Sequence, residues 1–249
     1  MAMSLFLKTR LTPSLKGAMQ YRVLFADSRF TRFFISGLFN SFGYFIPFYF
    51  LSIYAVQHGM TSAQGALLVG ILNLATGFGR ISLGLFADRF GHLKTFILSL
   101  FVSAASIILI WPFAKTFVTL SVFALMYGIF VGGYISLAPS TIVTLFGTKN
   151  IAAVTGILFS SSAVGNLFGP ACAAYILQST STTLPNGTVV LDFFPIMLLA
   201  FSGFFTGSCI VLSILIWPML WKQTAPVLQP SDTSTATNVA EARQPSEFE

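Results

Sequence analysis

Residues 65–94 read GALLVGILNLATGFGRISLGLFADRFGHLK. The first part of this stretch, residues 65–86, is apolar except for a few small polar side chains and one charged residue, Arg80. A helix needs about 20 such residues to cross the roughly 30 Å hydrocarbon core of a bilayer. The second part carries Asp88 and Arg89, which belong in water. The stretch therefore predicts a membrane-spanning helix followed by a short charged loop.

Five further apolar segments of similar length predict the same structure elsewhere in the chain. They are residues 33–54, 95–113, 117–140, 151–178 and 193–221. Lipid offers the backbone no hydrogen bonds, so continuous apolar segments form helices rather than the alternating strands of a barrel. Of the 249 residues, 55% are hydrophobic and 8% are charged, against about 25% charged in soluble domains. We expect an all-α membrane protein with six transmembrane helices.

Composition and residue counts exclude several other classes of protein. So few charged residues cannot cover a soluble surface or bind nucleic acid. The two Cys and two His are too few and too far apart for a disulfide framework or a metal site, and no motif indicates a cofactor. An intramembrane enzyme needs paired ionisable groups or a nucleophile beside a base. No Asp, Glu or His lies deep in any predicted span, so we expect no enzymatic activity.

The positions of the basic residues predict the orientation of the chain. Residues 1–32 form a basic leader, residues 33–221 the six spans, and residues 222–249 a polar tail that is expected to be disordered. If the leader is cytoplasmic, every Lys and Arg except Lys115 falls on the cytoplasmic side, as positive-inside topology requires. We therefore expect both termini in the cytoplasm, in the plasma membrane or alternatively an organelle membrane. The sequon at Asn186 would then be an external or lumenal glycosylation site.

A faint internal repeat relates the two halves of the chain. Residues 69–72 (VGIL) resemble residues 155–158 (TGIL), and Gly79 matches Gly165 at the same sequence separation. The repeat pairs spans one to three with spans four to six, and an odd number of spans inverts the second copy. It predicts a 3+3 inverted repeat, although glycine-rich membrane helices also produce such matches by chance.

One face of the second span collects its polar residues and glycines. Spaced three or four residues apart, they are Gly70, Asn73, Gly77, Arg80, Gly84 and Asp88. In lipid, such a face must meet protein or a water-filled cavity. Arg80 has three candidate roles: a cation that lines a solute pathway, an interfacial side chain that pairs with Asp88, or a packing residue.

Spans one and four repeat this pattern of small and polar residues around a proline. Their members are Ser36, Asn40, Gly43, Tyr44 and Pro47 in span one, and Gly128, Gly132, Tyr134, Ser136 and Pro139 in span four. Helices with Gly and Pro midway line cavities in transporters, although small residues also serve ordinary helix packing. We take Asn40, Tyr44, Asn73, Arg80 and Tyr134 as candidate substrate-binding residues.

The loop after span two carries a recognisable motif. Gly84, three residues, Asp88-Arg89, one residue, Gly91 and then a basic residue resembles the signature loop of the major facilitator superfamily, which lies between the second and third helices of a six-helix half. The resemblance implies a gating latch, in which an acid at a helix end pairs with cations and a helix dipole in one state. The alternative is an ordinary turn with positive-inside charges.

A wider stretch, from about Leu11 to Trp221, looks like the second half of a monocarboxylate-transporter-like protein, especially of the fungal branch. The runs that carry the likeness are residues 42–47, 73–91, 127–139 and 165–170. The resemblance implies that Arg80 contacts a substrate carboxylate. Animal carriers have an Asp one turn earlier, where this chain has Thr76. That departure leaves a different solute open, such as that of a riboflavin-type carrier.

These observations predict a transporter of a small organic solute that works by alternating access. The solute is expected to be anionic if Arg80 contacts it. The chain is also expected to be a truncated half-carrier. In a single six-helix bundle the polar faces of spans one, two and four would meet lipid, which is costly, so a partner bundle is expected to cover them. A first-half bundle or a second copy of the chain could cover them. The alternative function is a non-transporting membrane protein, such as a sensor or an assembly partner, that keeps the fold.

Overall fold

The computed structural model describes residue 25 and residues 27–147, 151–183 and 189–224. Most of the predicted leader, most of the predicted tail, and Asn186 lie outside the described residues. The chain divides into a first unit, residues 1–215, and a second unit, residues 216–249. The contacts below all lie within the first unit.

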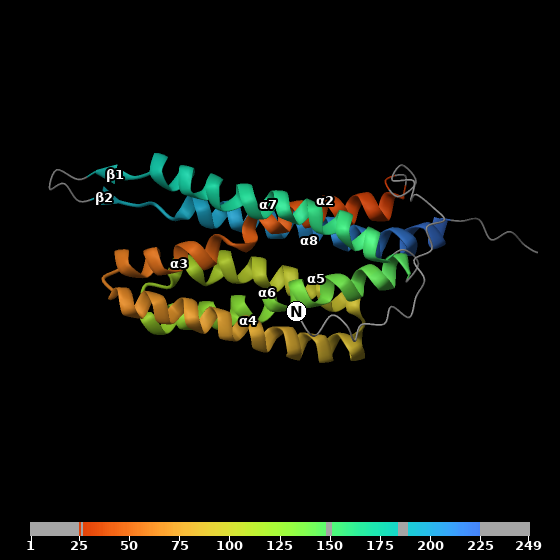
Figure 1. Cartoon of the computed structure of the whole chain (residues 1–249), viewed down its shortest axis with the longest axis horizontal. Coiled ribbons are helices and arrows are strands. Elements are labelled where there is room, and N and C mark those ends of the chain that lie inside the picture. Colours follow the sequence, from red (N-terminus) through yellow and green to blue (C-terminus); the bar gives the residue numbers. More distant parts are fainter. Residues whose placement is uncertain (1–24, 26, 148–150, 184–188, 225–249) are drawn as a thin grey trace, which may run out of the picture. The chain divides into compact units, whose positions relative to one another are not determined.

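Six described segments are long and apolar enough to cross a membrane, which confirms the predicted all-α six-span architecture (Figure 1). The elements are α2 (Ser28–Tyr44), α3 (Ile46–Gln57), α4 (Ser62–Phe90), α5 (His92–Leu109), the 3₁₀ turn η2 (Trp111–Phe113), α6 (Phe117–Phe146), α7 (Ile151–Ser179), β1 (Thr182–Thr183), β2 (Val189–Val190) and α8 (Phe194–Thr224). The two short strands pair antiparallel between α7 and α8. Several helices extend a few residues beyond the predicted apolar segments, because polar residues continue the helix past the hydrocarbon.

The first span is broken in the middle. The helix α2 ends at Tyr44 and α3 begins at Ile46, with Pro47 in its first turn. The Tyr127 hydroxyl on α6 donates to the Tyr44 carbonyl oxygen at 2.9 Å, so a side chain satisfies backbone at the break. Pro139, in contrast, lies inside an uninterrupted α6.

Close packing joins the helices in two symmetry-related pairs. On α4, a Cβ at Gly79 would collide with the Ile129 backbone of α6. On α7, a Cβ at Gly165 would lie 2.6 Å from the Leu38 carbonyl oxygen of α2. Only glycine permits two helices to approach so closely. The pair α4 and α6 and the pair α2 and α7 lie side by side in Figure 1. Span two on span four is thus matched by span five on span one, as an inverted repeat requires.

The opposite face of α4 is open. No described atom lies within 4 Å of a Cβ placed on Gly70, Gly77 or Gly84. These glycines belong to the polar stripe of the sequence, which we expected to meet protein or a cavity. Within the described part of the chain these three glycines contact no other helix, and α4 packs against α6 through its other face.

Aromatic side chains fill the end of the bundle that carries β1 and β2, which we call the hairpin end. Tyr54 packs edge-on against Trp111 and Phe193, with ring centroids 6.1 and 5.1 Å apart. Gln57, in α3, fixes the hairpin: its Nε2 donates to the Leu191 carbonyl oxygen at 2.7 Å, and its Oε1 accepts from the Leu191 N–H at 3.2 Å. The opposite end, at the loop between α4 and α5, is called the Asp88 end.

Candidate functional site

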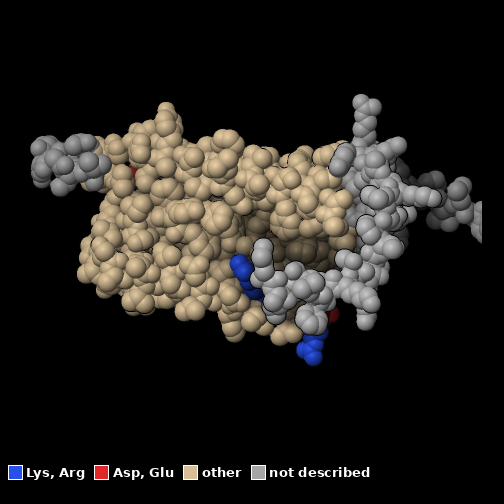
Figure 2. Space-filling model, in the orientation of Figure 1, with Lys and Arg blue, Asp and Glu red and all other residues tan. Residues whose placement is uncertain are grey.

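A cavity of about 420 Å³ lies between the two helix pairs. Figure 2 shows the surface hollowed in this region. Its lining residues are Phe33, Ser36, Gly37, Asn40, Ser41, Tyr44, Phe45, Arg80, Phe96, Tyr134, Ile135, Ala138, Ile142, Leu158, Phe159, Ser162 and Asn166. They lie near the middle of the spans or toward the Asp88 end. The cavity therefore lies away from the hairpin end, where aromatic rings pack together.

Four of the five predicted binding residues line this cavity, namely Asn40, Tyr44, Arg80 and Tyr134. The Arg80 guanidinium on α4 lies close enough to the Tyr44 hydroxyl, beside the helix break, to interact with it electrostatically. The Tyr44 and Tyr134 rings are 6.1 Å apart, and the Tyr134 hydroxyl lies 3.3 Å from Ser41 Oγ. A guanidinium carries five donors, so an interaction with one phenol leaves most of them unused. The arrangement can hold an anionic group against a largely apolar wall.

Asn40 reaches the same wall but is fully buried rather than exposed to lipid. Its Nδ2 donates to the Ser36 carbonyl oxygen and to Ser36 Oγ, each at 2.9 Å. Ser36 Oγ in turn donates to the Gly207 carbonyl oxygen of α8 at 2.9 Å. The side chain therefore braces α2 against α8, which corrects the expectation that a lone bundle would expose Asn40 to lipid.

Asn73 lies apart from the cavity. Its side chain is exposed, and its Nδ2 donates to the Val69 carbonyl oxygen in the preceding turn of α4 at 2.8 Å. Asn73 and Arg80 both lie on the open face of α4, but Arg80 alone of the two lines the cavity. The two residues share one face of the helix, as their spacing predicted, but only Arg80 takes part in the cavity.

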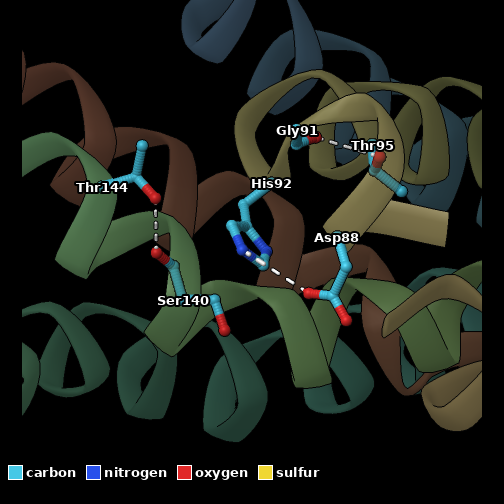
Figure 3. Close-up of polar contacts among 6 residues, drawn as sticks. All are labelled: Asp88, Gly91, His92, Thr95, Ser140 and Thr144. Carbon is cyan, nitrogen blue, oxygen red and sulfur yellow. Dashed lines mark hydrogen bonds and ion pairs between the residues drawn. The ribbon is translucent and has the colours of Figure 1, made fainter. Parts of the chain in front are cut away.

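The signature loop forms a compact turn (Figure 3). Gly91 has φ of 97°, a value that disfavours residues with a Cβ, and it joins α4 directly to α5. Asp88 Oδ1 lies 3.8 Å from His92 Nε2, and Thr95 Oγ1 donates to the Gly91 carbonyl oxygen at 3.0 Å. Arg89 is exposed at this turn.

Sequence reasoning missed two polar residues on α7 that line the cavity. Ser162 makes a side-chain hydrogen bond with Tyr134, and Asn166 lies one turn further along the helix. Their four-residue spacing was a usable signal, because it places both on one helical face. The resemblance drew attention to residues 165–170 as a family run, and their small residues concealed the polar role.

Comparison with known proteins identifies similar membrane transporters. A profile of the Major Facilitator Superfamily matches residues 33–243. The chain is 32% identical over 171 residues to the MFS transporter asaE of Aspergillus flavus, a match that covers 69% of this chain and 38% of that protein. It is 31% identical over 129 residues to the Aspyridones efflux protein apdF of Emericella nidulans, covering 51% and 26% respectively. It is 29% identical over 150 residues to monocarboxylate transporter 12 of Xenopus laevis, covering 59% and 32%. The chain spans less than half the length of these relatives.

Proposed function

Because this chain belongs to the Major Facilitator Superfamily, a family of non-enzymatic carriers, we propose that it transports a small organic anion by alternating access. The observation that supports this most is the position of Arg80, whose guanidinium lines a mid-bundle cavity beside Tyr44. A cation inside a membrane span is costly unless a partner or a solute uses it. Arg80 holds the anionic group, and the aromatic and aliphatic wall holds the body of the solute.

The cavity has room for a solute larger than a simple three-carbon acid. A volume of about 420 Å³ would hold roughly 14 water molecules at about 30 Å³ each, which exceeds what such an acid occupies. The relative named for monocarboxylates supports an organic acid, and a riboflavin-like solute is the alternative. Thr76 supports a departure from the animal carriers: it is buried against α6 and donates to the Leu72 carbonyl oxygen at 2.8 Å. We therefore propose transport without proton exchange at this position.

A second six-helix bundle completes the carrier in this proposal. The open glycine face of α4, with Asn73 and Arg80 exposed on it, supports a missing neighbour. In the family, substrate lies between two bundles that rock against each other. The second bundle is a first half from a relative or, alternatively, another copy of this chain.

The test is uptake of radiolabelled benzoate by cells that express the chain alone or with the first-half bundle of the Aspergillus flavus relative. We expect saturable flux with the pair, and none from protein that cross-linking shows to be monomeric. Flux from strictly monomeric chain would contradict the need for a second bundle. Absence of flux from the pair, with insertion of both confirmed, would instead favour the non-transporting alternative.

We propose that the Asp88 end and both termini are cytoplasmic. In a background with Cys172 and Cys209 replaced by Ser, Phe90→Cys and Val190→Cys each introduce one thiol at an exposed position, at the Asp88 end and the hairpin end respectively. In intact cells an impermeant maleimide is expected to label Val190→Cys, and Phe90→Cys only after permeabilisation. The reverse pattern would overturn this topology. With the proposed orientation, Asn186 is available for external or lumenal glycosylation.

A further inference from the structure

The carboxamide of Asn166 stands out among the polar groups of the cavity because nothing holds it. Asn166 lines the cavity from α7, and its Oδ1 is buried without a hydrogen-bond partner among the described residues. No described residue bonds its Nδ2 either. Buried amide groups normally have partners, so an unbonded one in the wall of a binding cavity calls for an explanation.

The other two asparagines described within the spans have an anchored amide nitrogen, although Asn40 Oδ1 is also buried without a partner. Asn40 Nδ2 is held by two bonds to Ser36, whose carbonyl oxygen is an acceptor only, so the orientation of that amide is fixed. Asn73 Nδ2 is held by the Val69 carbonyl oxygen. Asn166 has no such anchor, and rotation about its χ2 lets one side chain offer either an oxygen or an N–H₂ group.

Packing places this amide where a solute would meet it. The neighbouring Gly165 brings α7 against Leu38 and Ser41 of α2, so Asn166 cannot withdraw with its helix. Ser162, one turn earlier, is engaged with Tyr134. Arg80 enters the same cavity from α4, which lies in the opposite helix pair (Figure 1). The cavity therefore has an anion-binding group on one pair and an unengaged amide on the other.

We infer that Asn166 is a specificity-determining residue that hydrogen-bonds a second polar group of the solute, a hydroxyl, amine or carbonyl, across an apolar body from the anionic group at Arg80. The inference rests on the proposed function and narrows the substrate class from organic anions to bifunctional ones. An unfilled amide penalises an anion that lacks the second group, because its hydrogen-bonding capacity then stays unmet.

The test measures binding of benzoate, 3-hydroxybenzoate and 4-hydroxybenzoate by isothermal titration to the full chain, reconstituted in lipid nanodiscs together with the first-half bundle of the Aspergillus flavus relative. The wild type is expected to bind at least one hydroxybenzoate about three- to tenfold more tightly than benzoate, the range of one neutral hydrogen bond. In Asn166→Leu, of similar shape, the ratio is expected to fall to about one. Gln178→Leu removes an exposed carboxamide from the same helix outside the cavity and is expected to keep the wild-type ratio.

The possible outcomes distinguish a failure of the role inferred for Asn166 from a failure of the proposed transport function. Arg80→Gln is expected to weaken all three ligands; unchanged binding there, or no binding to the wild type, overturns the proposed function. If Arg80→Gln weakens binding but Asn166→Leu keeps the wild-type ratio, Asn166 has no such role. Asn166→Ala guards against a folding defect, and each variant must unfold at the wild-type temperature. A wild-type ratio of one for both hydroxybenzoates also overturns the inference.

Discussion

Replacing Arg80 with Gln is expected to lower benzoate uptake by about ten- to a hundredfold in cells that also express a first-half bundle. The substitution removes a charge-assisted hydrogen bond of about 1.5–3 kcal/mol, and each 1.4 kcal/mol is about a factor of ten. Arg80→Lys is expected to retain an intermediate rate, because it keeps the charge but loses the planar fork that meets a carboxylate with two bonds.

The measurement is the initial rate of uptake, normalised to protein that surface labelling shows to be inserted. Lys115→Gln is the matched control, because it removes a cation outside the cavity. It is expected to leave uptake near the wild-type rate. Wild-type flux in both Arg80 variants would show that this side chain does not contact the solute.

Gly132→Leu is expected to destabilise the bundle strongly. A side chain there would collide with the Thr76 carbonyl oxygen and approach the Arg80 backbone nitrogen, which a Cβ alone already meets at 3.2 Å. Overpacking typically costs about 1–3 kcal/mol. We expect it to separate α4 from α6, to move Arg80, and to lower both the yield of folded protein and its unfolding temperature in detergent.

Gly77 supplies the matched control on the open face of α4. Gly77→Leu meets no described atom, so we expect an unfolding temperature equal to or above the wild type, since Gly is a poor helix former. The same variant is expected to weaken association with a first-half bundle if that bundle covers this face. An equal loss of stability at positions 77 and 132 would contradict the packing described for α4.

The spans were predictable because length and hydropathy alone define them. The break before Pro47 was not, because Pro139, in a similar pattern of small residues, lies inside an uninterrupted helix. The face of α4 that packs against α6 could not be predicted from the sequence. In lipid, buried and lipid-facing side chains are equally apolar, so periodicity does not distinguish the two faces of a helix. Helix α4 carries small residues on both, Gly79 on one and Gly77 on the other, and the face with the polar stripe attracted attention. Arg80 and Asn40 both line the cavity, and Asn40 also braces α2 against α8, a contact that the sequence pattern does not reveal. Asn166 was not singled out, because it lies in a run of small residues.

The aromatic rings packed at the hairpin end give the bundle an electrical asymmetry. A cavity that reaches toward the Asp88 end lets the potential of the adjacent aqueous phase extend inward to Arg80. The transmembrane voltage then falls mainly across Tyr54, Trp111 and their neighbours. An unbalanced charge that passes this layer crosses nearly the whole field, at about 2.3 kcal/mol for each 100 mV. Under the proposed function, an anion that enters from the Asp88 end is expected to join Arg80 with little electrical work, and its passage to the other side is expected to be the voltage-sensitive part of the cycle.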